Sequence, residues 1–294
     1  MVEERSVASK MFDIINHVFL AILSITCVLP IIHILMISLS STSAVSSGFV
    51  TFWPVEFTLS SYIYVIKRLE FWTAFQVTIE RVIIGGAVNI SLVLLTAYPL
   101  SRDENSLKFR KFYVWFFFFT MLFNGGLIPT FMVVKKVGLL DNIWSLILPN
   151  ALSVYNLVLM INFFRQVPKE LEEAATIDGA GHWTILLKVF IPVLVPSIAT
   201  ITLFTIVAHW NSWFDGLIYM NFPRNYPLQT YLRVLLTQSA NMFDIGDDSE
   251  LMFLISGRTI KAAQVFIGAL PILMVYPFLQ RYFVKGMLLG GVKG

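Results

Sequence analysis

The sequence predicts an all-α, polytopic membrane protein with six transmembrane helices and both termini in the cytoplasm. The 294 residues are 57% hydrophobic and only 13% charged, and their mean hydropathy is +0.75. A soluble domain averages about 25% charged residues, so a water-soluble core could not hide this much apolar surface. The apolar residues also gather in long segments that reach the roughly 20 residues needed to cross a bilayer.

The apolar segments define the expected spans in chain order. They are Phe12–Ser38, Phe75–Ser101, Phe112–Val134, Trp144–Phe164, Val189–Leu217 and Ile260–Phe283. Gly85, Gly86 and Ala87 give the second span a small face for close contact with another helix. No clear internal repeat interrupts the series, so residues 1–294 are expected to form a single membrane domain.

The basic residues indicate which side of the membrane each loop occupies. Short cytoplasmic loops carry an excess of Lys and Arg. The densest basic cluster, Arg102–Lys111, follows the second span, and placing it inside also places both termini inside. The long segments Ser41–Trp72 and Tyr219–Gly257 are then expected outside.

A polar segment between the fourth and fifth spans, residues 165–192, falls on the inner side. It contains the acidic cluster Glu170–Glu173, then Ala174–Ala175, then Asp178–Gly179–Ala180. Glycine tolerates positive φ and can end a helix sharply. The order of residue types predicts a helix, a tight break and a second helix outside the bilayer. A connector that only joined two spans would not need this order, so we expect a docking site for another protein.

Polar residues within the spans are candidates for a substrate path, because bare polar groups in hydrocarbon are costly. Asn side chains and the Trp indole N–H can hydrogen-bond hydroxyl groups, and aromatic faces can cover a sugar ring. The alternative is hydrogen bonding between helices and an interfacial aromatic belt. The candidates, from the fourth and fifth spans, are Tyr155, Asn156, Trp210, Asn211, Trp213 and Asp215. Glu80 and Arg81 are instead expected to be interfacial and structural.

Several motifs of other protein classes are absent from the sequence. There is no GxxxxGK[ST] phosphate loop, no HExxH and no GxSxG. The four histidines do not have the spacing of metal ligands, so neither a metal site nor a cofactor is expected. No basic patch suggests nucleic acid as a partner. The chain is therefore not expected to be an enzyme.

The motif EAATIDGA at Glu173–Ala180, followed by Ile191–Pro192, resembles the EAA loop of bacterial ABC-importer permeases. The usual ending is closer to Leu-Pro. Further matches are FNGGLIPTF at Phe123–Phe131, YPLQTYLR at Tyr226–Arg233 and a long stretch at Arg258–Gly294. They resemble the carbohydrate-uptake class of these permeases (MalG-like), within it the LplC/YtcP-type subgroup, which is related to the smaller permease subunit of the alginate importer.

The resemblance implies the type I ABC-importer permease fold and a location in the bacterial cytoplasmic membrane. It implies import of sugars, most often oligosaccharides and including acidic ones, by alternating access. The implied partners are a second homologous permease, two ABC ATPase subunits that hold ATP and Mg, and an extracellular solute-binding protein. Residues 165–192 would be the EAA coupling loop, hereafter the coupling loop. Its coupling residues would be Glu173, Ala174, Ala175, Asp178, Gly179 and Ala180.

Two other classes of function compete with this one. An ion-coupled secondary transporter or channel would need acids or bases at mid-span, and such residues are nearly missing. An intramembrane enzyme would need a paired nucleophile and base, or metal ligands, at membrane depth. ATPase-dependent uptake would separate the first alternative from an ABC permease, and activity of the purified chain alone would support the second.

Overall fold

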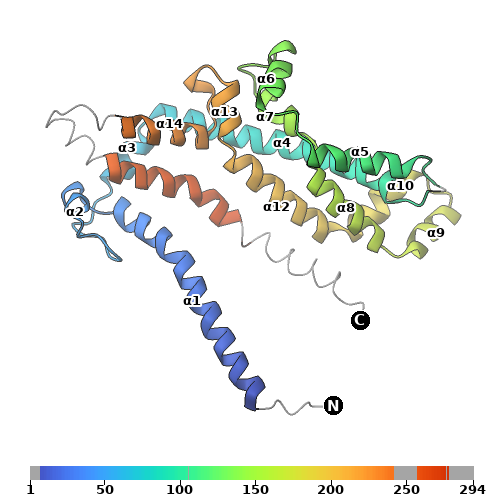
Figure 1. Cartoon of the computed structure of the whole chain (residues 1–294), viewed down its shortest axis with the longest axis horizontal. Helices are drawn as coiled ribbons and strands as arrows, with labels where there is room; N and C mark the ends of the chain where they lie inside the picture. The colour runs from blue at the N-terminus through green and yellow to red at the C-terminus, as the bar shows by residue number, and fades with distance from the viewer. Residues whose placement is uncertain (1–6, 105, 242–256, 276, 278–294) are drawn as a thin grey trace. The chain divides into compact units, whose positions relative to one another are not determined.

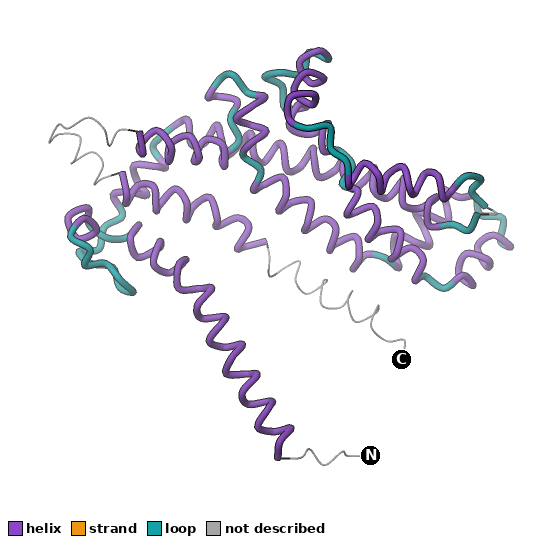
Figure 2. Tube along the Cα trace, in the orientation of Figure 1, coloured by secondary structure: helices purple, strands orange, loops and turns teal. Residues whose placement is uncertain are grey.

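The computed structural model describes residues 7–104, 106–241, 257–275 and 277. In these ranges every regular element is a helix and no β-strand occurs, so the all-α prediction is confirmed (Figure 2). The chain divides into two compact units, one comprising Met1–Leu69 and Val234–Ala269, the other Glu70–Arg233 and Leu270–Gly294.

The first unit is built around a long apolar helix, α1 (Val7–Ser38), which is followed by α2 (Thr42–Ser46) and α3 (Ser60–Ile66). The apolar side chains of α1 are largely exposed, as expected for a helix whose solvent is lipid. Ser41 begins α2 because its hydroxyl accepts a hydrogen bond from the Ala44 amide at 3.2 Å. Residues near these helix ends form a small core with Ala262.

The second unit is a helical bundle in which α8 packs against both α5 and α12, and α4 runs beside them (Figure 1). Its core joins Val93 and Ala97 of α4, Met160 and Phe164 of α8, and Ile201 of α12. The helices of this unit are α4 (Leu69–Ser101), α5 (Arg110–Leu122), α6 (Leu127–Lys136), α7 (Trp144–Ile147), α8 (Val154–Gln166), α9 (Lys169–Ile177), α10 (His182–Thr184), α11 (Ile191–Val193), α12 (Val195–Asn211), α13 (Phe214–Tyr219) and the first residues of α14 (Leu228–Asn241). A π-helical turn, η2 (Ile185–Phe190), and two short 3-10 turns, η1 (Leu148–Asn150) and η3 (Pro223–Asn225), complete it.

Among the described residues, three helices are long and apolar enough to cross a membrane: Ser9–Ser38, Leu69–Ser101 and Gly257–Val275. These coincide with the first, second and sixth expected spans. The sixth was expected to reach Phe283, and its last residues lie outside the described ranges apart from Pro277.

The third, fourth and fifth expected spans are not straight helices. Each is a pair of helices that is long and apolar enough to cross a membrane only when both members are taken together. The pairs are bent by 110°, 53° and 83°. The number of candidate spans reaches six if each bent pair is one span.

The breaks have local causes in the sequence. Between α5 and α6, Gly126 has φ +88°, and its amide donates to Asn124 Oδ1 at 2.9 Å, which turns the chain. Before α8, Ser153 caps the new helix by accepting from the Asn156 amide at 3.3 Å. Between α11 and α12, Pro196 lacks the amide hydrogen that a continuous helix would need.

Candidate functional site

The coupling loop folds as a helix that ends in a glycine turn. Glu170 and Glu172 lie in the first turn of α9, where negative charge stabilises the positive end of the helix dipole. At the other end, Gly179 has φ +79°. Its amide donates to Thr176 O at 3.0 Å, and the Ala180 amide donates to Ala175 O at 2.9 Å. This pair of bonds is a Schellman motif, which satisfies the last carbonyl groups of the helix.

The six predicted coupling residues divide between two faces of this loop. Ala175 and Ala180 pack against the core of the second unit. Glu173, Ala174, Asp178 and Gly179 are exposed. Large apolar side chains extend the exposed face, because Ile177 is 86% and Trp183 is 64% exposed. Exposed apolar side chains on a polar loop are typical of a surface that binds another protein.

The sequence suggested that Glu173 could pair with a basic residue of the chain or of a partner. In the structure the neighbouring Glu172 forms the intramolecular ion pair, with Arg102. Glu173 itself is exposed.

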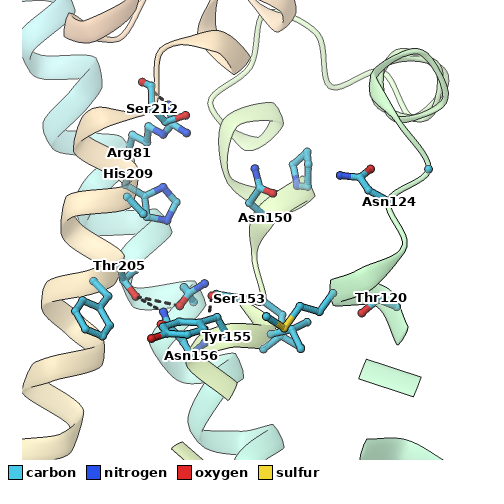
Figure 3. A pocket seen from close by; sticks show the side chains of 18 of the residues that line it. Arg81, Thr120, Asn124, Asn150, Ser153, Tyr155, Asn156, Thr205, His209 and Ser212 are labelled. Atoms are coloured by element: carbon cyan, nitrogen blue, oxygen red, sulfur yellow. Dashed lines mark hydrogen bonds between the residues drawn. The ribbon is translucent and has the colours of Figure 1, made fainter. Parts of the chain in front are cut away.

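A polar cavity of about 870 Å³ lies within the second unit (Figure 3). One wall carries Thr205 and His209 of α12, and Asn150, the last residue of η1, lies across from His209 (Figure 3). Ser153 and Tyr155, where α8 begins, lie at the lower end of the view (Figure 3). Further lining residues are Thr120, near the end of α5, and Asn124, in the break between α5 and α6. The bends in the expected spans therefore place polar side chains around one space.

A hydrogen-bonded network closes one side of this cavity. Asn156 Nδ2 donates to Thr205 Oγ1 at 3.2 Å. The Thr205 hydroxyl lies 3.1 Å from Asn89 Oδ1, and Asn89 Nδ2 donates to Ala151 O at 3.1 Å. The three side chains are at most 4% exposed, and their polar groups satisfy one another. The network fixes α4, α8 and α12 relative to one another at the cavity.

Arg81 of α4 lines the same cavity and forms an ion pair with Asp215 of α13. The carboxylate of Asp215 also accepts from Ser212 Oγ at 2.8 Å and from the Gly216 amide at 2.9 Å. Arg81 is 2% exposed and serves as a structural ion-pair partner, and its expected position at the membrane interface stays a prediction. Its positive charge is compensated inside the protein, because a buried charge requires a partner.

The structure places the six substrate-path candidates in different surroundings. Tyr155 and Asn156 line the cavity, and the other four do not. Trp210 is 3% exposed and packs edge-on against Phe75 at 6.0 Å between ring centroids. Asn211 is exposed, and the ring of Trp213 lies 5.0 Å from the Arg233 guanidinium. Asp215 serves as the partner of Arg81.

Sequence reasoning missed several residues that line the cavity. Asn89 lies in the middle of an apolar span, so its position alone could have indicated that it faces a cavity or another helix. Thr205 offered none, because a threonine in a helix can bond its own backbone, as it does here to Ile201 O at 2.9 Å. Asn124 lies in a break that the expected third span did not contain.

Comparison with known proteins confirms the resemblance drawn from the motifs. Residues 109–289 match the family described as binding-protein-dependent transport system inner membrane component. The chain is 40% identical over 291 residues to the polygalacturonan/rhamnogalacturonan transport system permease protein YtcP of Bacillus subtilis, covering 97% of this chain and 99% of that protein. It is 38% identical to protein LplC of the same organism, with 98% and 96% covered.

A solved structure has the same fold. It belongs to a bacterial ABC transporter involved in the import of the acidic polysaccharide alginate. One of its chains superposes with a TM-score of 0.83 and 33% identity, covering 95% of this chain and 98% of that one. With a family match over more than half of its length and relatives that align almost end to end, the chain belongs to the inner membrane components of binding-protein-dependent transport systems.

Proposed function

We propose that the chain is the permease subunit of an ATP-driven ABC importer that carries sugars across the bacterial cytoplasmic membrane by alternating access. The observation that supports this most directly is α9. None of its residues is buried, it is held by an ion pair and a Schellman motif, and it presents Ile177 at 86% exposure. A helix built in this way is suited to receive force from another protein.

The proposed topology has six spans and both termini in the cytoplasm. Three straight helices and three bent pairs are compatible with six spans. The basic cluster Arg102–Lys111 and the coupling loop then lie on the same, inner side. Lys169 Nζ lies 3.0 Å from Asp103 Oδ2, so these two segments are neighbours in space.

The proposed partners follow from the family. Such a permease works with a second, homologous permease, two ABC ATPase subunits that hold ATP and Mg, and an extracellular solute-binding protein. The exposed face of the coupling loop would seat on an ATPase subunit. The cavity would form one half of the translocation path, and the second permease would supply the other half.

The proposed substrates are oligosaccharides, including acidic ones. Asn, Ser, Thr and Tyr side chains around the cavity can exchange hydrogen bonds with sugar hydroxyls. Tyr155 is 55% exposed, and its ring lies 6.4 Å from that of Phe204, so an aromatic surface is present for a sugar ring. Relatives named for polygalacturonan, arabinooligosaccharide and alginate transport support this class.

An ion-coupled secondary transporter is the second candidate, and the same cavity disfavours it. Among the described residues that line the cavity, Arg81 is the one with a permanent charge, and Asp215 neutralises it. His209, which could exchange a proton, is 6% exposed and lies against Gly85 of α4. An ion-coupled cycle would need a titratable or charged group free to exchange its partner.

The proposal is tested by ATP hydrolysis in proteoliposomes that contain this chain, the second permease and the ATPases. A solute-binding protein is added with hydrolysates of polygalacturonan, alginate or arabinan, or with lactose as a small neutral sugar. We expect one loaded binding protein to stimulate hydrolysis and to drive sugar uptake. Uptake by the chain alone under an ion gradient, without ATP, would contradict the proposal and favour the secondary transporter.

A further inference from the structure

Two ion pairs join α9 to the residues that directly follow α4. In one, Lys169 Nζ lies 3.0 Å from Asp103 Oδ2, and the two side chains are 76% and 74% exposed. In the other, the Arg102 guanidinium is paired with Glu172 Oε1, and the side chains are 12% and 29% exposed. The pairs connect the same two segments and differ mainly in their access to water.

The Arg102 guanidinium is enclosed by aromatic rings as well as by Glu172. It lies 4.3 Å from the ring centroid of Tyr98, one turn earlier in α4, and 5.2 Å from that of Phe190 in η2. Tyr98 in turn packs edge-on against Phe164 of α8, at 5.9 Å between centroids. Arg102 therefore lies where α4, α8, α9 and η2 meet.

Partial burial makes the Arg102–Glu172 pair difficult to separate. Nε and Nη2 of Arg102 are buried atoms that donate to no acceptor among the described residues, and Glu172 is the carboxylate paired with this guanidinium. If α9 moved alone, Arg102 would be left as a partly buried charge without its partner, which is unfavourable. Separation of Lys169 from Asp103 has little consequence, because water solvates both groups. A displacement of α9 should therefore carry Arg102 with it.

From Arg102 the displacement has a direct route to the cavity. Helix α4 is continuous from Leu69 to Ser101, and Asn89 lies 13 residues before Arg102. At 1.5 Å per residue this is a distance of about 20 Å. Asn89 belongs to the hydrogen-bonded network with Thr205 and Asn156, so movement of α4 along its axis would act on the cavity wall.

We infer that Arg102 is a positioning residue that transmits movement of the coupling loop to α4, and through α4 to the cavity. This inference rests on the proposed function, since it describes how the permease is driven. It assigns transmission to the partly buried Arg102–Glu172 pair and none to the exposed Lys169–Asp103 pair.

The test uses the complete complex in proteoliposomes, with the binding protein and a polygalacturonan hydrolysate as the probe. Uptake is measured per ATP hydrolysed, because a residue needed only for folding would lower the amount of active complex and leave this ratio unchanged. The variants are Arg102→Gln, Glu172→Gln and the double variant. The matched control is Asp103→Asn, which removes the exposed pair and lies next to Arg102.

We expect both single variants to assemble with the ATPases and to lose about tenfold in uptake per ATP, the scale at which residues along a coupling route act. The double variant should lose no more than a single one, and the control Asp103→Asn should match the wild type. If Arg102→Gln fails to assemble, Glu172→Gln decides, because it leaves the arginine in place. If the wild-type complex is active and Glu172→Gln has the same uptake per ATP hydrolysed as the wild type, this inference is overturned and the proposed function is not. A wild-type complex that hydrolyses ATP without uptake of any hydrolysate would overturn the proposed function as well.

Discussion

Gly85 and Gly86 are neighbours in α4 and both are buried, but only at Gly85 would an added Cβ meet another helix. A Cβ added at Gly85 would lie 2.7 Å from Cε1 and 2.9 Å from Nε2 of His209, whereas nothing lies within 4 Å of one added at Gly86. His209 is 6% exposed, so its ring has little room to move. The close approach of α4 and α12 beside the cavity therefore depends on the missing side chain at one position.

Gly85→Ala should destabilise the second unit by about 1–3 kcal/mol, because overpacking a filled contact displaces the His209 ring or the helices. Gly86→Ala, the adjacent control, should stabilise the unit by about 0.5–1 kcal/mol, because alanine favours a helix more than glycine does and an added Cβ meets no atom within 4 Å. The measurement is thermal unfolding of the purified chain in lipid nanodiscs. Equal unfolding temperatures for the two variants would show that the predicted contact between α4 and α12 is absent.

Arg81 illustrates what the sequence conceals about a single residue. In the sequence it stands beside Glu80, which suggested a local, interfacial pair of charges. In the structure its partner is Asp215, 134 positions away. Glu80 instead accepts a hydrogen bond from Gln76 Nε2 at 2.9 Å. Which of two nearby carboxylates pairs with an arginine depends on burial, and burial is a property of the folded chain.

At the scale of elements, the coupling loop depends on the turn that ends α9. The sequence order of alanines, Asp178 and Gly179 predicted this turn, because a positive φ strongly favours glycine. The prediction of a positive φ at Gly179 is confirmed by its value of +79°. The coupling role of the loop remains a prediction.

Gly179→Pro should abolish uptake while the chain still inserts into the membrane. Proline holds φ near −65°, so it cannot adopt the conformation found here, and it also lacks the amide that bonds Thr176 O. Gly181→Ala is the matched control, because Gly181 has φ −74° and no atom lies within 4 Å of an added Cβ. Uptake is measured in proteoliposomes and insertion by alkaline extraction of membranes. Normal uptake by Gly179→Pro would remove this turn from the coupling mechanism.

A second element-level contact joins the loop after α6 to the segment after α13. Asp141, at φ 58°, donates its amide to Tyr219 O at 2.9 Å. Its carboxylate accepts from the amide and from the side chain of Asn221, both at 2.5 Å. The Asn221 amide is the main reason that the pKa of Asp141 is lowered below its usual value.

This contact should be insensitive to pH near neutrality and weaken in acid. Because the pKa of Asp141 is lower in the folded chain, its contribution is complete above the unfolded value of about 3.9 and is lost as pH falls through the folded pKa. Hydrogen exchange of the Asn221 amide should therefore be protected at about pH 6 and lose that protection, after correction for intrinsic rates, as the pH falls through the lowered pKa of Asp141. Asp141→Asn should remove the dependence of this protection on pH. If the Asn221 amide keeps the same pH-dependent protection in Asp141→Asn, that protection comes from another contact.

At the scale of the whole molecule, the proposed topology can be tested with single cysteines. Cys27 is the one cysteine of the sequence, so Cys27→Ser provides a background without thiols. Ser47 and Ser106 are exposed and lie in segments proposed to be outside and inside, respectively. A membrane-impermeant maleimide should label Ser47→Cys in right-side-out vesicles and Ser106→Cys in inside-out vesicles. The reverse pattern would show that the topology is inverted. Labelling of both cysteines from one side would show that the chain does not cross the membrane between them as proposed.

The sequence by itself determined the class of the protein, its three straight apolar helices and the turn at Gly179. These depend on composition, on the length of apolar segments and on the backbone preference of one residue, all of which are local. Its motifs also sufficed to identify the family, because they match relatives along almost the whole chain.

Only the tertiary structure decided where the third, fourth and fifth spans bend and which polar residues share a cavity. Asn89, Asn156 and Thr205 come from three helices that are distant in the sequence, and their hydrogen bonds exist only once those helices pack. The Arg81–Asp215 and Arg102–Glu172 pairs have the same origin. A buried polar group must find a partner, but many partners are compatible with one sequence, and only the packing of the helices selects among them.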